Sequence, residues 1–392
     1  MFTAATLLFA CGDDASDPEP TPPRDAGRDA SRDAGRDSGR DAEVLPVEDA
    51  SQDEEPDARV VEEDASTATP DAGLDCSPPA DGVLPRNLHC TGLYKSGTEL
   101  ADGLVQYTPK YVLWSDDAEK RRFVSLPPGT KVDVSNPDAF VYPEGTKFWK
   151  EFSVRGSDGV SRRAETRLLQ KGPDGWLYTS YVWNAAETQA LQMDNTNGVP
   201  DLKVGGTSHI VPTRDQCNEC HGGRDDQILG WDAIMLDADG TGVTPEWLAP
   251  LIEGELPRQI IPGNAVEKAA LGYLHANCGI SCHNDNPAAK ARDSGLFLRL
   301  EVGELSSVRS TDAWKAINKQ PSPNAKLDGL PTIQGSWVGI RPGDPDRSLL
   351  IARQRIRGFE SQMPRIGTNI VDEQGTQTVA DWIKAMPANT TP

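Results

Sequence analysis

The chain has 392 residues, seven cysteines and a net charge of −21. Most of this charge belongs to residues 12–75, which hold 21 acidic residues and six arginines, a net charge of −15. The rest carries little net charge, which argues against a nucleic-acid partner, and it contains no apolar run of the roughly 20 residues needed to span a bilayer.

Residues 1–11 resemble a bacterial lipoprotein signal. An apolar run from Ala4 ends at Cys11, where lipidation would create the mature N-terminus. The run is short and no Lys or Arg precedes it, so we expect the natural start to lie upstream. The alternative is an N-terminal segment without a targeting role. A lipoprotein would lie in the cell envelope, periplasmic or anchored at the outer membrane, and would contact a membrane only through its lipid.

Residues 12–75 are predicted to form a disordered acidic linker. They consist mainly of Asp, Ala, Pro, Gly and Ser, with near-repeats between Arg24 and Asp41. Such a composition cannot bury a hydrophobic core. A flexible chain of this length has an end-to-end distance of roughly 45 Å, which suits a spacer. A solvated tail without a specific role is the alternative.

Residues 76–205 predict a β-rich domain, either a sheet or a sandwich. Short apolar and aromatic runs alternate with turns that contain Gly and Pro, which is typical of strands of four to eight residues. The Trp and Tyr side chains either fill the core or line a ligand groove. We expect strands at 111–114, 122–125, 147–150, 165–169 and 176–183.

Cys76 and Cys90 are the first two cysteines after the acidic segment. In an oxidising compartment we expect them to form a disulfide. The bridge would close a loop of about 15 residues and stabilise the fold by about 3 kcal/mol. His89, beside Cys90, is interpreted as a surface or packing histidine.

Residues 206–392 are predicted to be mainly α-helical, after a boundary at Gly205-Gly206. Asn264 is a good N-cap for a helix over 264–277. Apolar side chains at i, i+3, i+4 and i+7 predict a second helix over 374–386. We also expect a short helix near 312–317 and a strand at 295–299. The whole chain is therefore assigned to the α+β class.

The segment Cys217-Asn-Glu-Cys220-His221 has the C-x-x-C-H pattern of covalent c-type haem attachment. The two thiols add to the haem vinyl groups, and the histidine binds the iron. The lead-in, residues 211–216, is not predicted to be helical. The sequence does not decide which residue is the second axial ligand of this iron. Met235 is the first choice, an unligated iron is another possibility, and the remaining candidates are His209, His275 and Met193.

The segment Cys278-Gly-Ile-Ser-Cys282-His283 has one extra residue between its cysteines. We interpret it as a second haem site with His283 as the iron ligand, in which Gly279 absorbs an unusual backbone conformation. The alternatives for the four cysteines are a tetrahedral zinc site and plain disulfides.

Residues 264–386 resemble a class I cytochrome c domain with an enlarged middle loop. Ala270 and Leu274 precede Cys278 by eight and four positions, and Trp382 fits the aromatic contact between the first and last helices. The resemblance implies that Met363, in a Met-Pro pair, is the second axial ligand of this iron.

Over residues 79–386 the chain resembles a family of bacterial dihaem c-type cytochromes with a β-rich N-terminal region. The resemblance lies in the motifs at 80–85, 113–116, 126–130, 165–169, 181–184, 211–217, 277–278, 342–350 and 363–364. It implies two haems c and electron transfer to a redox partner that the sequence does not identify.

The sequence therefore predicts an exported dihaem cytochrome that carries electrons, with no acid–base pair or nucleophile assigned to catalysis. Two alternatives stay open. One is a haem enzyme, a peroxidase or an oxidoreductase subunit, that uses an open first iron. The other is a non-haem surface-binding lipoprotein whose aromatic β-domain recognises a ligand.

Overall fold

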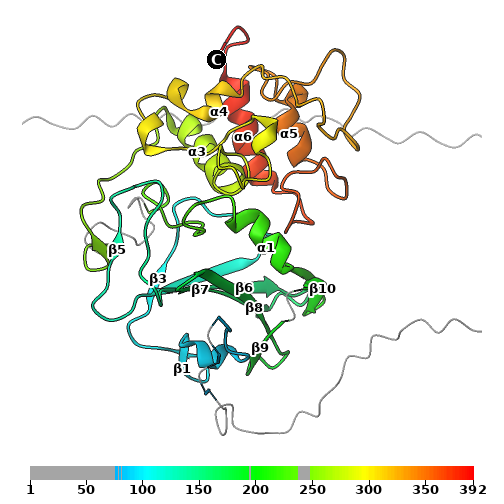
Figure 1. Ribbon diagram of the computed structural model, residues 1–392. Coiled ribbons are helices and arrows are strands. Elements are labelled where there is room, and N and C mark those ends of the chain that lie inside the picture. The colour runs from blue at the N-terminus through cyan, green and yellow to red at the C-terminus, as the bar shows by residue number, and fades with distance from the viewer. Residues whose placement is uncertain (1–75, 78, 81, 194–195, 237–247) are drawn as a thin grey trace, which may run out of the picture. The chain divides into compact units, whose positions relative to one another are not determined.

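The computed structural model describes residues 76–77, 79–80, 82–193, 196–236 and 248–392. The described residues belong to one compact unit, which combines a β-sheet with several helices, so the α+β class is confirmed (Figure 1). The predictions for Cys11 and for residues 12–75 lie outside the described residues. None of the described helices is long and apolar enough to cross a bilayer.

A six-stranded antiparallel sheet forms the centre of the β-rich region, in the order β3-β4-β6-β7-β8-β9 (Figure 1). The four predicted strands from 122 to 183 lie within β4, β6, β7 and β8. The strands are β3 (Val105–Tyr107), β4 (Glu119–Ser125), β6 (Lys147–Arg155), β7 (Ser161–Gly172), β8 (Gly175–Trp183) and β9 (Ala190–Gln192).

Three smaller pairs of strands complete the β structure. Strands β1 (Tyr94–Ser96) and β2 (Glu99–Leu100) are antiparallel, and β5 (Val132–Asp133) runs parallel to β12 (Ile252–Glu253). The hairpin of β10 (Val199–Val204) and β11 (Thr207–Val211) turns at Gly205-Gly206. Both glycines have positive φ, which suits a tight hairpin turn. The position predicted as a domain boundary is thus a turn within β structure.

Successive side chains of a strand point to opposite sides of the sheet, and each side packs against a different part of the chain. One face packs on the segment that precedes β3, in a core that includes Leu88, Phe123, Trp149 and Tyr181. On the other face, Val124, Phe148 and Leu169 pack against side chains from residues 228–236 and 248–252. The aromatic residues named here are buried core residues, and two of them, Phe148 and Trp149, also line a cavity.

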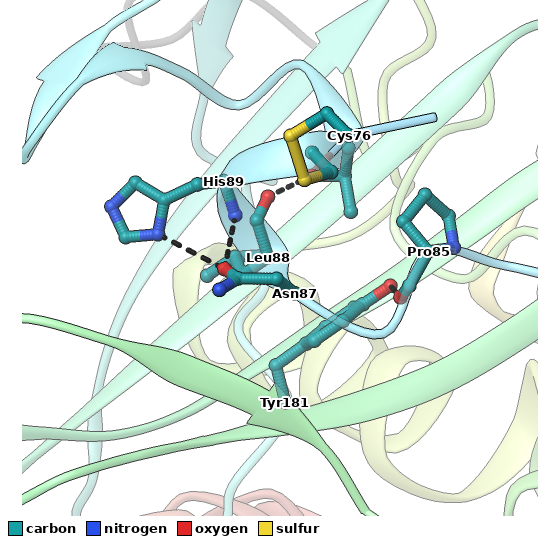
Figure 2. Close-up of a disulfide and its surroundings, with 8 residues drawn as sticks. Cys76, Pro85, Asn87, Leu88, His89 and Tyr181 are labelled. Atoms are coloured by element: carbon teal, nitrogen blue, oxygen red, sulfur yellow. Dashed lines mark hydrogen bonds between the residues drawn. A yellow bond between two sulfur atoms is a disulfide. The ribbon is translucent and has the colours of Figure 1, made fainter. Parts of the chain in front are cut away.

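Cys76 and Cys90 form the predicted disulfide, which fastens the start of the described chain to the turn η1 (Leu88–Thr91) (Figure 2). The Tyr181 hydroxyl holds the same segment to the sheet by donating to the Pro85 carbonyl at 2.7 Å (Figure 2). His89 contacts Asn87 and the Gly97 carbonyl, as expected for a packing histidine.

The helices form a second core around α3 and α6, which lie side by side (Figure 1). Asn264 caps α3 in a reciprocal capping box with Glu267, which satisfies two backbone donors of the first turn. Trp382 is 1 % exposed in this core together with Ala270 and Leu274. The helices are α1 (Arg214–His221), α3 (Ala265–Leu274), α4 (Asp312–Lys315), α5 (Leu349–Gln354) and α6 (Glu373–Ala385).

Two predicted strands, 111–114 and 295–299, are wrong. The backbone of the first segment is hydrogen-bonded to the Asn277 side chain. This side chain accepts a hydrogen bond from the Trp114 N–H at 2.7 Å and donates one to the Val112 carbonyl. In the second, the Leu298 N–H donates to the His283 carbonyl at 2.8 Å. Both apolar segments therefore pair with the second cysteine motif rather than with a strand.

Candidate functional site

The first cysteine motif lies on α1. Thr213 and Gln216 form a capping box at its start, so the helix begins before Cys217, and the prediction of a non-helical lead-in is wrong for residues 214–216. The sequence did contain the reason, because Thr-x-x-Gln is the capping-box pattern. Cys217 and Cys220 fall one turn apart on the helix, and His221 is its last residue.

The second motif begins where α3 continues into a π turn, η2 (His275–Gly279). The N–H of His283 donates to the Cys278 carbonyl at 2.9 Å, five residues earlier. A π turn holds one residue more than an α turn, so it accommodates the extra residue of this motif. Gly279 does not have positive φ. It is needed because a Cβ there would lie 2.2 Å from the Arg299 nitrogen.

The histidines of the two motifs make the same kind of hydrogen bond. The Nδ1 of His221 bonds to the Gln227 carbonyl at 2.7 Å, and that of His283 to the Leu296 carbonyl at 3.0 Å. A carbonyl only accepts, so Nδ1 carries the proton and Nε2 keeps the lone pair that can bind a metal. Burial lowers the pKa of both histidines to about 4, which keeps them in the neutral, ligating form.

The two motifs lie against each other. The thiols of Cys220 and Cys282 are within hydrogen-bond reach, which raises the pKa of Cys220 and lowers that of Cys282. The Asn284 side chain donates to the Gly223 carbonyl at 3.2 Å. All four motif cysteines are free thiols, so the disulfide alternative is not realised in this structure.

One cavity of about 600 Å³ is lined by both motifs, including all four cysteines and both histidines. Met363 and Met235 also line it. The thioether predicted for the second iron thus shares a cavity with His283. Met235 is 3 % exposed and packs with Ala276 and Ile280, beside the second motif.

The other proposed ligands of the first iron are less well placed. His209 lines the cavity, but its Nε2 is 3.0 Å from the Glu165 carboxylate. The Nδ1 of His275 accepts a hydrogen bond from the Leu300 N–H at 2.9 Å. Neither His275 nor Met193 lines the cavity. Met235 therefore remains the prediction for this position.

A zinc site at the cysteines has no support in the geometry. Across the described ranges, no three His, Cys, Asp or Glu side chains are grouped so that they could hold a metal ion. A haem iron needs only one or two protein ligands, so this observation does not bear on haem.

Two features that support the site were missed in the sequence. Asp116 accepts the backbone N–H groups of Asn369 and Ile370 at 2.8 and 2.9 Å, which ties the loop after Met363 to the β-rich region. Arg224 is buried between Asp226 and Asp232, at 2.6 and 2.8 Å. This ion cluster fixes the segment that follows the first motif.

Comparison of the chain with protein-family models, curated proteins and solved structures found no match. The functional argument therefore depends on the residues and their geometry.

Proposed function

We propose that this protein is an exported dihaem c-type cytochrome that transfers electrons, tethered to the envelope through Cys11. Its first haem would be bound by Cys217, Cys220 and His221. Its second haem would be bound by Cys278, Cys282, His283 and Met363. Each bound haem would supply a one-electron ferric–ferrous couple.

The observation that carries the proposal is the matched pair of histidines on one cavity. Each ring follows a pair of free cysteines, lies one helical turn beyond the first of them, and donates Nδ1–H to a backbone carbonyl. That hydrogen bond fixes both the tautomer and the orientation of an iron-ligating imidazole. The packing histidine His89 also contacts a carbonyl, through Nε2, so the hydrogen bond alone is not diagnostic. The support comes from its combination with the preceding cysteine pair, which occurs twice on one cavity.

The helical part of the chain supports the resemblance to class I cytochromes c. Helix α3 leads into the second motif, α6 packs on α3, and Met363 lines the cavity from the segment between α5 and α6. Met363 is held in place by its N–H, which donates to the Arg353 carbonyl at 3.0 Å. The chain thus has a soft sulfur ligand and a nitrogen ligand on one cavity, and such a pair would raise the reduction potential of a haem bound there.

The test is to produce the full chain in a host that attaches c-type haem. Intact mass and a pyridine haemochrome spectrum should show two haems per chain. The Cys217→Ala/Cys220→Ala variant should keep one haem, and Cys278→Ala/Cys282→Ala should keep the other. Colourless protein from a host that matures a control cytochrome would refute the proposal and favour a surface-binding lipoprotein.

A second candidate is a haem enzyme that uses the first iron. The observation in its favour is that His209 is engaged by Glu165 while His275 and Met193 lie off the cavity, so Met235 alone remains of the proposed ligands. Carbon monoxide added to the reduced protein separates the two candidates. It binds an iron with a free axial position and changes the haem spectrum, whereas it does not bind an iron whose two axial positions are held by protein ligands.

A further inference from the structure

Three cationic side chains form a row across the sheet. Arg122 on β4 pairs with Lys150 on β6, and Lys150 pairs with Arg167 on β7. Directly opposed residues of an antiparallel sheet point to the same side, and all three residues line the cavity. At its ends the row continues into Tyr107 and Ser180, which also line the cavity.

Within the described part of the chain, only one of the three cations has a partner of opposite charge. Arg167 forms two hydrogen bonds to Glu165, at 2.7 and 2.8 Å. Arg122 is 5 % exposed, and its guanidinium forms no ion pair or hydrogen bond with any described residue. Lys150 likewise has no ion pair there, and its Nζ lies 4.9 Å from the centre of the Phe152 ring.

The row is electrostatically unfavourable as it stands. Like charges directly opposite each other destabilise a sheet, and a buried charge without a counterion is costly. Burial lowers the pKa of Arg122. Burial, followed by the charges of Arg122, Lys120 and Arg167, lowers the pKa of Lys150 well below its usual value. Glu165 is the nearby carboxylate on this face, and it is already bound to Arg167 and His209.

The row faces the first cysteine motif. Tyr178 lies on the same side of β8 as Ser180. Its hydroxyl donates to the Asn218 side chain between the two cysteines, and its ring stacks on the His221 ring with 6.3 Å between centroids. An anion in this part of the cavity would therefore lie between the motif and the sheet. It would meet two cations that have no carboxylate partner among the described residues.

We propose that Arg122 and Lys150 form an anion seat that binds a carboxylate or a small oxyanion beside the first cysteine motif. Two sources offer this chemistry. One is the propionate groups of the first haem, and this source rests on the proposed function. The other is a free anion that enters the cavity, which needs no haem.

The experiment compares the full chain with Arg122→Gln, Lys150→Gln and the control Lys131→Gln. Lys131 is exposed and does not line the cavity, so its variant makes the same charge change elsewhere. Haem content is counted first, which tests the proposed function separately. Because the two cations repel each other, neither seat variant is expected to be less stable than the control when the seat is empty, that is, in haem-free protein without added anion.

If propionates occupy the seat, Arg122→Gln and Lys150→Gln keep two haems, but the midpoint potential of the first haem falls relative to Lys131→Gln. The sign follows because a nearby cation disfavours the more positive ferric state. If a free anion occupies it, formate in place of chloride at constant ionic strength raises the Tm of the parent and of Lys131→Gln. That rise is lost in both seat variants.

Colourless protein would refute the haem source and the proposed function, while the formate measurement would still test the seat. The seat itself is refuted if the two variants match Lys131→Gln in midpoint potential and in their response to formate.

Discussion

Gly223 is the position at which the docking of the two cysteine motifs can be tested most directly. It lies two residues after His221, and its carbonyl accepts the Asn284 side chain. A Cβ added at Gly223 would lie 1.8 Å from the Ser281 carbonyl oxygen, a backbone atom of the second motif. The Gly223→Ala substitution therefore presses one motif against the other.

The magnitude follows from that distance. An ordinary carbon–oxygen contact needs at least about 3.4 Å, so the backbones must separate by roughly 1.5 Å. Overpacking of this kind costs about 1–3 kcal/mol. The Asn284 hydrogen bond would be broken as well, which adds about 1 kcal/mol. We expect Gly223→Ala to lower the free energy of unfolding by about 2–4 kcal/mol.

The measurement is urea unfolding of the two alanine variants Gly223→Ala and Gly303→Ala. Gly303 is the matched control, because a Cβ there meets no atom within 4 Å and its φ is not positive. Gly303→Ala should unfold at nearly the parent midpoint. Equal unfolding free energies for the two variants would show that the motifs do not pack as described.

Three further predictions concern the parts that hold the site together. Cys90→Ser should lower the unfolding free energy by about 3 kcal/mol, since Cys76 and Cys90 are 14 residues apart; a parent protein that is equally stable with and without reductant would contradict this. Asp116→Ala should free the loop after Met363. If the proposed second haem is bound, its ferric spectrum should then show a smaller fraction with sulfur ligation, whereas the neighbouring Asp117→Ala, our control, should leave that fraction unchanged. Burial raises the pKa of Glu165, but Arg167 and His209 outweigh it and lower that pKa to about 2. The ionised Glu165 therefore stabilises the folded state above about pH 4.5, and this stabilisation is lost as the pH falls through 2. The difference in unfolding free energy between the parent and Glu165→Gln should thus narrow by about 3 kcal/mol from pH 7 to pH 2. A difference that stays constant with pH would refute this prediction.

Local patterns were sufficient to predict the parts of the fold that local physics decides. The strands at 147–150 and 176–183 lie within β6 and β8, where aromatic and β-branched residues fill both faces of a sheet. The helix after Asn264 begins where its capping box predicts. The segments 111–114 and 295–299 have the same apolar character, yet their partners are Asn277 and His283. Tertiary contacts over such separations leave no local pattern.

The candidate site likewise has residues that local sequence patterns predict and residues that only the assembled fold brings together. The cysteines and histidines were found from spacing alone, because attachment chemistry requires them to be close in sequence. Sequence spacing could not predict the cation row, because Arg122, Lys150 and Arg167 lie on different strands. Their alignment depends on strand register, and register is a property of the assembled sheet.

The irregular spacing of the second motif has a structural explanation that makes the two sites comparable. In α1 the histidine follows the first cysteine by four residues, which is the span of one α-helical hydrogen bond. In the second motif the span is five, and the hydrogen bond from His283 to Cys278 closes a loop of π width. In both motifs the histidine thus lies one turn beyond the first cysteine, and its Nδ1 reaches a carbonyl farther along the chain. An inserted residue in a regular α-helix would instead rotate the histidine by about 100° away from the cysteines. The π turn therefore removes the main objection to reading the second segment as a haem-attachment motif.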